Sequence, residues 1–212
     1  MGARTQVAER YLAADELERR MVDAALRCVE RWGLAKTSMD DIAREAQVSR
    51  ATVYRVFPGG KDRLVETVLQ HEVGRLFHEA DSEARQATSL EDLVCVGVGI
   101  AMRTLTGNAA LNYLVHHEPE AILPHFAFHR LAPLLADVAE LSRPHLGRFL
   151  PDDAVRPAAE LLARVVLSYS FNPVPELDPG DPDSIRRFVR TYLLPALTPD
   201  VKAKAKGTQE RT

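Results

Sequence analysis

Two short segments, each preceded by a serine, constrain the fold of this chain more than any other feature of its sequence. Ser38 precedes a segment whose first turn is acidic, so its side chain can cap a helix and the charges suit the helix dipole. Ser49 precedes a second predicted helix, residues 50–56, in the same way. Gln47 and Val48 form the tight turn between them, so the sequence predicts a helix-turn-helix.

The residue types inside this segment favour a close contact between the two helices. Ala43 and Ala46 are small and allow the helices to approach each other. Val48 and Val53 would close the small core between them, and Phe57 would anchor the end of the second helix on its neighbours. A helix-turn-helix of this kind can place its second helix in the major groove of DNA, with the N-terminus leading.

The side chains left outside this core are of types that contact DNA. Arg50 and Arg55 can bond guanine edges bidentately, and Tyr54 can bond a phosphate. Thr52 can meet either a base edge or a phosphate. The formal net charge of −3 does not by itself indicate nucleic-acid binding, yet residues 47–61 hold three basic residues and no acidic one. The local distribution of charge therefore favours a DNA-contacting face here.

Helical periodicity dominates the rest of the chain, and no strand pattern of alternating residues occurs. Apolar residues at spacings of three and four predict a helix from Asp15 to Trp32, ended by Gly33, and a long helix from Lys61 to about Glu79. A nearly continuous apolar run from Leu90 to Leu105 predicts a third long helix, which is buried inside a domain. We expect an all-α fold of about nine helices, the later ones at 90–105, 109–117, 124–149, 154–170 and 184–197.

These elements divide the chain into four parts. Residues 1–14 are expected to form a flexible arm, and residues 15–60 a helix-turn-helix domain. Residues 61–198 would form a larger helical domain for ligand binding and dimerisation. The polar, lysine-rich residues 199–212 are expected to be a disordered tail.

The N-terminal pattern resembles the DNA-binding domain of the tetracycline-repressor (TetR) family. The similarity spans roughly residues 17–70, and its matching positions are Thr37-Ser38, Ile42-Ala43, Ala46-Gln47-Val48-Ser49, Thr52-Val53-Tyr54-Arg55, Phe57-Pro58 and Lys61. The resemblance implies a three-helix DNA-binding domain, a long fourth helix as connector, and a helical C-terminal domain that dimerises and binds a ligand. It also implies a set of DNA-contacting residues, namely Thr37, Ser38, Ser49, Arg50, Thr52, Tyr54, Arg55 and Lys61.

Two positions depart from the pattern of that family. Gln47 stands in the turn where the family usually has glycine, so we expect a strained or reshaped turn. Gly59 and Gly60 stand where a polar residue and a serine often precede the lysine. The long connecting helix is therefore expected to lack its usual cap.

The C-terminal part combines aliphatic, aromatic and polar side chains where the pockets of this family usually lie. We expect a cavity that suits a small apolar effector, such as a fatty acyl or other lipid-like molecule, but the sequence does not identify it. An alternative is an acyl-CoA-dependent regulator, which needs its ligand to bind DNA and would have a basic rim at Arg103 or Arg130. The expected ligand-binding residues are Leu105, Leu111, Leu114, His117, Phe126 and His129.

The resemblance implies a transcriptional repressor that binds a palindromic double-stranded DNA operator as a homodimer. The last two predicted helices, 154–170 and 184–197, carry apolar stripes that would form the dimer interface. Ligand binding would move the long helix and change the separation of the two DNA-binding units. A different class of function, a helical protein-interaction module, predicts no sequence-selective DNA binding at all.

The sequence gives no support for catalysis, for a metal or other cofactor, or for a membrane partner. It contains no glycine-rich phosphate loop, no Gly-x-Ser-x-Gly motif and no His-Glu-x-x-His motif. His125 and His129 share a helix face, but no nearby cysteine or carboxylate completes a zinc-binding spacing. The longest strongly apolar stretch, 93–102, is too short to span a bilayer, and no signal peptide is evident, so a cytoplasmic location is expected.

Overall fold

A computed structural model describes residues 16–126 and 128–198, except for the side chains of Phe128 and His129. The predicted arm, 1–14, and the predicted tail, 199–212, lie outside the described residues. All regular structure in the described part is helical, which confirms the all-α class. Its elements are α2 (Glu16–Trp32), α3 (Met39–Glu45), α4 (Arg50–Val56), α5 (Gly60–Gln86), α6 (Leu90–Gly107), α7 (Ala109–His117), α8 (Pro119–Ile122), a 3-10 turn (Leu123–Phe126), α9 (Phe128–Leu146), α10 (Asp152–Phe171), α11 (Pro182–Phe188), a π-helical turn (Val189–Leu193) and α12 (Leu194–Leu197).

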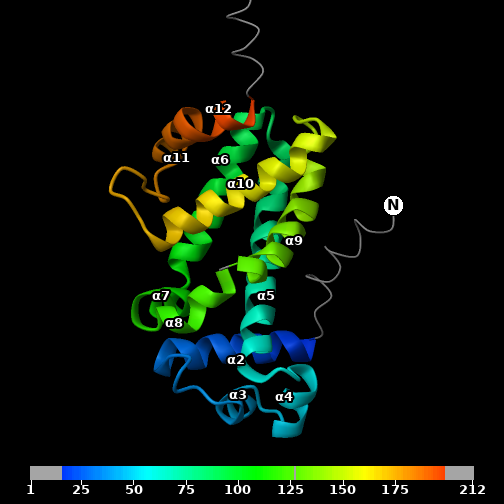
Figure 1. The fold of residues 1–212 in the computed structure, drawn as a ribbon, viewed down its shortest axis with the longest axis vertical. Coiled ribbons are helices and arrows are strands. Elements are labelled where there is room, and N and C mark those ends of the chain that lie inside the picture. Colours follow the sequence, from blue (N-terminus) through cyan, green and yellow to red (C-terminus); the bar gives the residue numbers. More distant parts are fainter. Residues whose placement is uncertain (1–15, 127, 199–212) are drawn as a thin grey trace, which may run out of the picture.

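Helices α2, α3 and α4 form a small N-terminal unit at one end of the molecule (Figure 1). Its core consists of buried apolar side chains that come from all three helices and from the start of α5, among them Met21, Ile42, Val53, Phe57 and Leu64. The predicted core residues of the helix-turn-helix are therefore in place. Short helices such as α3 and α4 are marginal alone, so this shared core is what stabilises them.

Helix α5 connects the N-terminal unit to the rest of the molecule and rises through its centre (Figure 1). Leu64 packs in the core of the N-terminal unit, whereas Ala84 packs in the core at the opposite end. The helix continues to Gln86 instead of ending near Glu79 as predicted. Residues 80–86 contain neither glycine nor proline, so nothing in the sequence interrupts the helix there.

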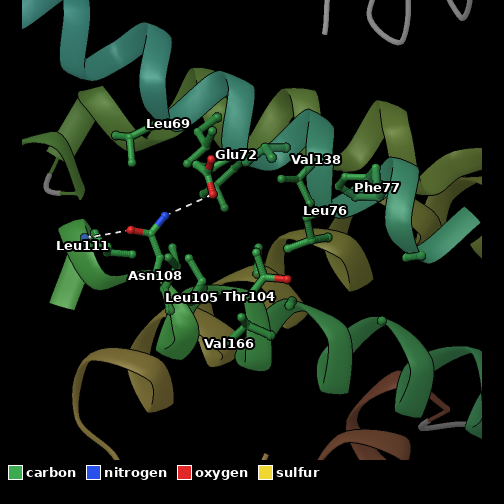
Figure 2. Close-up of a pocket in the computed structure, with 18 of the residues that line it drawn as sticks. Leu69, Glu72, Leu76, Phe77, Thr104, Leu105, Asn108, Leu111, Val138 and Val166 are labelled. Carbon is green, nitrogen blue, oxygen red and sulfur yellow. Dashed lines mark hydrogen bonds between the residues drawn. The ribbon is translucent and has the colours of Figure 1, made fainter. Parts of the chain in front are cut away.

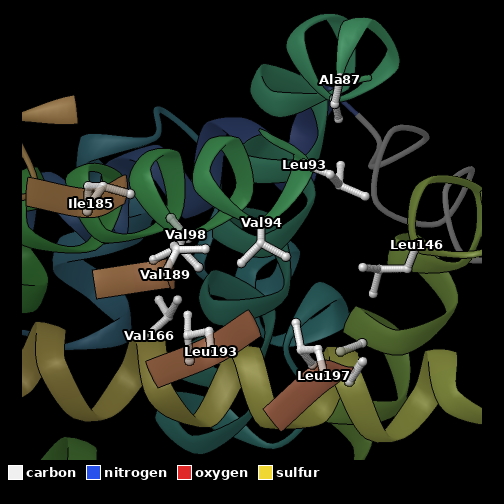
Figure 3. Packing of buried hydrophobic residues seen from close by; sticks show 14 of the residues in the cluster. Ala87, Leu93, Val94, Val98, Leu146, Val166, Ile185, Val189, Leu193 and Leu197 are labelled. Atoms are coloured by element: carbon white, nitrogen blue, oxygen red, sulfur yellow. The ribbon is translucent and has the colours of Figure 1, made fainter. Parts of the chain in front are cut away.

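In the larger part of the fold, α6 and α9 pack against α5, α10 packs against α6 and α9, and α11 with the following π-helical turn packs against α6. Figure 3 shows Val94 and Val98 of α6 packed close to Val166, Val189 and Leu193. These side chains form one continuous apolar core at this end of the molecule. It is separate from the core of the N-terminal unit, and α5 contributes to both.

Two segments differ from the predicted helices. The segment predicted as one helix, 184–197, is instead α11, a π-helical turn and α12. The wide turn comes just before Pro195, which has no N–H for a helix hydrogen bond. The helix predicted for 124–149 is replaced by the 3-10 turn followed by α9, which ends before Gly147. No single helix of the described part is long and apolar enough to cross a membrane, and α6 with α7, which pass that test only as a pair, are bent by 69°.

The two parts of the molecule meet where α2 contacts α7. A third apolar cluster fills this junction and includes Val29 and Leu34 beside α2, Val65 of α5, and Leu111 and Leu114 of α7. The junction therefore joins the N-terminal unit directly to α7, the helix that carries three of the predicted ligand-binding residues, Leu111, Leu114 and His117.

Candidate DNA-binding and ligand-binding sites

Both short helices of the helix-turn-helix are capped by their predicted serines. Ser38 Oγ accepts the N–H of Asp41 at 3.1 Å, and the Asp41 carboxylate accepts the N–H of Ser38 at 3.0 Å. The hydrogen bonds that Ser38 donates lower the pKa of Asp41 below its usual value, which keeps this cap charged. Ser49 Oγ accepts the N–H of Thr52 at 3.1 Å and lies 2.8 Å from the Thr52 hydroxyl. The starts of α3 and α4 are thereby fixed by local bonds.

The turn between α3 and α4 requires an unusual backbone conformation. Gln47 has a φ of 56°, in the left-handed region that normally favours glycine, and it is exposed. The turn nevertheless forms its backbone bonds, since Val48 N–H donates to the Ala43 carbonyl at 2.9 Å. Arg20 of α2 also donates to the Ala46 carbonyl at 2.7 Å. Gly59, before α5, makes no side-chain cap, as the sequence indicated.

The outer face of α4 presents a basic and aromatic surface. Tyr54 is 41% exposed, and Arg50 and Arg55 are exposed beside it. The Arg50 guanidinium lies 5.4 Å from the centre of the Tyr54 ring and 3.0 Å from the Asp40 carboxylate. Arg50 is therefore held over Tyr54 and paired with a carboxylate that a phosphate or guanine edge would have to replace.

The side chain of Thr37, for which a phosphate contact was predicted, does not lie at the surface. It is completely buried, and its hydroxyl donates to the Gly33 carbonyl at 2.6 Å, where it closes the end of α2. Lys61 is half-buried, and its ammonium donates to the carbonyls of Leu34 and Ala35 at 2.9 and 3.3 Å. Lys61 thus ties the start of α5 to the loop after α2, and its contact with phosphate stays a prediction.

A long apolar cavity runs beside α5 from α2, where Leu26 and Val29 line it, through the C-terminal part. Its volume is about 230 Å³, and it is lined from α5 by residues from Leu64 to Ala84, which span about 30 Å along a helix axis. Figure 2 shows its middle, where Leu69 and Leu76 of α5 lie opposite Leu105 of α6. The walls of this elongated cavity, called the channel below, are almost entirely aliphatic and aromatic.

The structure brings four of the six predicted ligand-binding residues to this cavity. They are Leu105, Leu111, Leu114 and Phe126. His117 does not line the cavity, which differs from the prediction. Its side chain is exposed and stacks on Tyr113, with the ring centroids 4.6 Å apart. The side chain of His129 lies outside the described residues.

Sequence reasoning missed the contribution of α5 to the cavity wall. Leu69, Val73, Leu76 and Phe77 line it. Their helical spacing was visible in the sequence but is equally typical of a packed core, so only the arrangement of the helices distinguishes the two roles.

Polar groups occur at two places along this channel. In the middle, Glu72 Oε2 accepts hydrogen bonds from Asn108 Nδ2 at 3.1 Å and from Arg75 at 2.6 Å. Toward the far end, His145 Nε2 lies 3.3 Å from the Asp81 carboxylate. Burial lowers the pKa of His145, and the nearby Asp81 carboxylate opposes this shift only in part.

A buried glutamate connects the ligand-side helices to the N-terminal unit. Glu118 lies between α7 and α8, is only 8% exposed, and accepts the backbone N–H of Ala35 at 2.9 Å. It packs against Gly33, where a Cβ would collide with Glu118 Oε1 and where φ is 79°. Gly33 is thus required by both its backbone conformation and this contact. Neither the burial of Glu118 nor its partner was predictable from local sequence.

Comparison with known proteins identifies the N-terminal unit. Residues 21–68 match the family model described as bacterial regulatory proteins, tetR family. A curated relative, the HTH-type transcriptional regulator BetI of Brucella canis, is 28% identical over 82 residues, which cover 39% of this chain and 41% of BetI. The chain thus aligns with about two fifths of the length of the curated relatives it matches.

The fold is also found in solved structures of regulators. One is the TetR family repressor AlkX from Dietzia, implicated in biodegradation of n-alkanes, with a TM-score of 0.66 and 22% identity over 82% of this chain and 96% of AlkX. Another is FadR from Bacillus subtilis in complex with stearoyl-CoA, with a TM-score of 0.53 and 15% identity over 82% of this chain and 97% of FadR.

Together, the fold and the capped helix pair define a helix-turn-helix regulator with an all-helical C-terminal part. Residues 21–68 are similar to the DNA-binding domain of bacterial regulatory proteins of the tetR family, and these comparisons support a regulator of that family.

Proposed function

We propose that this protein is a ligand-responsive transcriptional repressor that binds operator DNA as a homodimer. The observation that carries the proposal is the outer face of α4, where Arg50, Tyr54 and Arg55 are exposed on a helix with a capped, solvent-facing N-terminus. A single helix, α5, connects that face to an apolar cavity. The protein would act without catalysis, in the cytoplasm, where its DNA is.

The proposed DNA contacts follow from the chemistry of each exposed side chain. Arg50 and Arg55 would bond base edges or phosphates, and Tyr54 would bond a phosphate. Ser38 and Ser49, at the starts of α3 and α4, would add contacts at helix N-termini, where phosphate binds favourably. Thr52 and Lys61 would supply further polar contacts, whereas buried Thr37 no longer belongs to the set.

The proposed homodimer would use α10 together with α11 and α12. Tyr192, beside α11, is 64% exposed although it is large and aromatic, and Leu161 and Val165 of α10 are only partly buried. Apolar side chains left partly exposed at one end of a helical domain favour an interface. A two-fold dimer would place two α4 helices about 34–36 Å apart, or slightly more, to meet successive major grooves.

The shape and walls of the cavity support an elongated apolar effector. The channel follows about 30 Å of α5, which suits a chain-like molecule, such as a fatty acyl or lipid-like one, better than a compact one. Solved structures of the same fold include one bound to stearoyl-CoA. The acyl-CoA-dependent alternative is less well supported here, because neither Arg103 nor Arg130 lines the cavity, and Arg130 lies 3.7 Å from Asp62.

The proposed signal passes through α5 and α7. Helix α5 lines the cavity along much of its length and carries Lys61 at its start, and α7 contributes Leu111 and Leu114 to the cavity while Glu118 holds the loop after α2. A ligand that displaces either helix would change the position of the N-terminal unit and so the separation of the two α4 helices. Ligand and DNA affinities would then be coupled reciprocally.

The first test is selection of double-stranded DNA from a randomised pool by the full-length protein. We expect enrichment of a palindromic sequence and binding as a dimer, measured by fluorescence anisotropy and light scattering. Arg50→Ala and Tyr54→Ala should abolish binding at protein concentrations that saturate the unaltered chain, with dimer and fold unchanged. Arg103→Ala, an exposed arginine on α6, is the matched control and should bind normally. Failure to enrich any sequence would support the protein-interaction module instead.

A further inference from the structure

The middle of the cavity contains a carboxylate with an unused oxygen. Both hydrogen bonds that Glu72 accepts, from Arg75 and from Asn108, end on Oε2. Within the part of the chain that the structure describes, Oε1 accepts none, although Glu72 lines the cavity and its side chain is 17% exposed. A carboxylate offers about four acceptor positions, so Glu72 retains capacity for a partner on the cavity side.

A second polar group faces the cavity close to Glu72. Thr104 of α6 lines the channel one turn before Asn108, and no hydrogen bond to its hydroxyl occurs among the described residues. Figure 2 shows Glu72 on α5 and Thr104 on α6 on either side of the same space, with Asn108 between them. The surrounding wall, including Leu76, Val138 and Val166, is apolar. A few polar side chains at one place in an apolar wall determine where the polar group of a ligand can lie.

The charged side chains that line the cavity are hydrogen-bond acceptors. Of the described residues that line the cavity, two are carboxylates, Glu72 and Asp81, and none is lysine or arginine. His145 is neutral because burial lowers its pKa. An anion beside Glu72 would meet a carboxylate whose cationic partner, Arg75, is already paired with it and does not line the cavity, which is unfavourable.

From this arrangement we propose that the effector is an elongated apolar molecule that carries a hydrogen-bond donor, an alcohol or an amine, which bonds Glu72 Oε1. Thr104 accepts from or donates to the same group. Fatty acids and other chains that end in an anion are excluded from this position. The inference deepens the proposed function by naming the chemical class of the ligand, and it concerns binding to the cavity with or without DNA.

The same geometry explains how such a ligand reaches the N-terminal unit. Asn108 ends α6 and caps α7, because its Oδ1 accepts the N–H of Leu111 at 2.9 Å while its Nδ2 bonds Glu72. A ligand donor on Oε1 would therefore bind the same carboxylate that holds Asn108 through Oε2, at the bond between α5 and the junction of α6 and α7. A shift of Glu72 on ligand binding would reach this junction, and α7 is the helix that contacts α2.

The test compares three ligands with equal chains on the unaltered full-length protein, by isothermal titration calorimetry without DNA. Decanol and decylamine are expected to bind at least about tenfold more tightly than decanoate, the difference that one hydrogen bond to a charged group supplies. Equal or tighter binding of decanoate would overturn the proposal, as would the absence of binding by both decanol and decylamine. All three ligands are measured on the unaltered protein, so no outcome depends on whether a variant folds.

Variants then locate the bond and separate the two donors. Glu72→Gln keeps a neutral acceptor, so decanol should retain its affinity within a few-fold, whereas decylamine should lose about tenfold because its cation no longer meets a carboxylate. Glu79→Gln, an exposed glutamate on the same helix, is the matched control and should change neither. Equal effects of the two substitutions on decylamine would contradict a bond at Glu72. DNA selection, performed without these ligands, tests the proposed function independently.

Discussion

The N-terminal unit and the channel beside α5 are built on opposite principles. In the N-terminal unit, apolar side chains form a closely packed core, and Thr37 and Lys61 bond backbone carbonyls of Gly33 and Leu34 around it. In the channel, apolar walls enclose empty space, and Glu72 leaves one carboxylate oxygen without a described partner. The difference indicates that one region is organised for a fixed shape and the other to be completed by a ligand.

The largest expected difference between the two regions comes from the same substitution, phenylalanine to alanine, made in each of them. Phe57→Ala removes a fully buried ring from the close-packed N-terminal core and should lower the free energy of unfolding by about 3–5 kcal/mol. Phe77→Ala only enlarges an existing cavity from a partly exposed position, so we expect a loss of about 1–2 kcal/mol. Chemical denaturation measures both. Equal losses would show that the channel wall is packed as tightly as the N-terminal core.

The junction between the regions can be broken at Glu118. Glu118→Ala removes the acceptor of the Ala35 N–H and leaves that group without its partner, which should lower the unfolding free energy by about 1–3 kcal/mol. It should also weaken the effect of a cavity ligand on DNA affinity. Glu120→Ala, exposed in the next turn, serves as the control. A stability loss without any change in this coupling would assign Glu118 to folding alone.

The strained turn offers a smaller, stabilising test. Gln47→Gly places glycine at a φ of 56°, where it relieves about 1–2 kcal/mol of backbone strain and loses about half of that to its freer unfolded state. We therefore expect a net gain of about 0.5–1 kcal/mol, measured by thermal unfolding. Ala46→Gly, one residue earlier in a right-handed conformation, should instead destabilise. A loss of stability in Gln47→Gly would mean that the side chain contributes more than the strain costs.

The smallest expected effect is the response of the far end of the channel to pH. Burial lowers the pKa of His145, partly offset by Asp81, so this imidazole stays neutral in the folded protein at pH values where it is protonated in the unfolded chain. Its contribution to stability is full above about pH 6.5 and declines as the pH falls toward the lower folded pKa. His145→Gln should flatten the pH dependence of the unfolding free energy over that interval. An unchanged slope would assign it to other groups, such as His125, whose pKa burial also lowers.

The same contrast explains what could be predicted from sequence. Ser38, Ser49 and Gln47 act within a few residues of themselves, so caps, turn and core of the helix-turn-helix were predictable from local chemistry. The burial of Thr37 was not predicted, because it depends on how the loop after α2 folds back, which local pattern does not contain.

The channel depends on contacts between distant segments, and there the sequence was less informative. His117 was assigned to the cavity by its position in the chain, but the direction of α7 turns it outward onto Tyr113. Glu72 and Asn108 are 36 residues apart, and neither stands out until α5 and α6 are side by side. The residues of α5 could be recognised as apolar, but whether they close on a core or enclose a cavity is decided by packing.

The central claim, that α5 and α7 couple the channel to the DNA-binding face, is tested most directly by one anisotropy measurement. The affinity of the full-length protein for its selected DNA is measured with the channel empty and with it saturated by whichever of decanol, decylamine and decanoate binds most tightly. We predict that the affinity for DNA falls by about fivefold or more, and that DNA weakens the binding of the probe by the same factor. DNA affinity that stays the same while calorimetry shows the channel to be filled would contradict it.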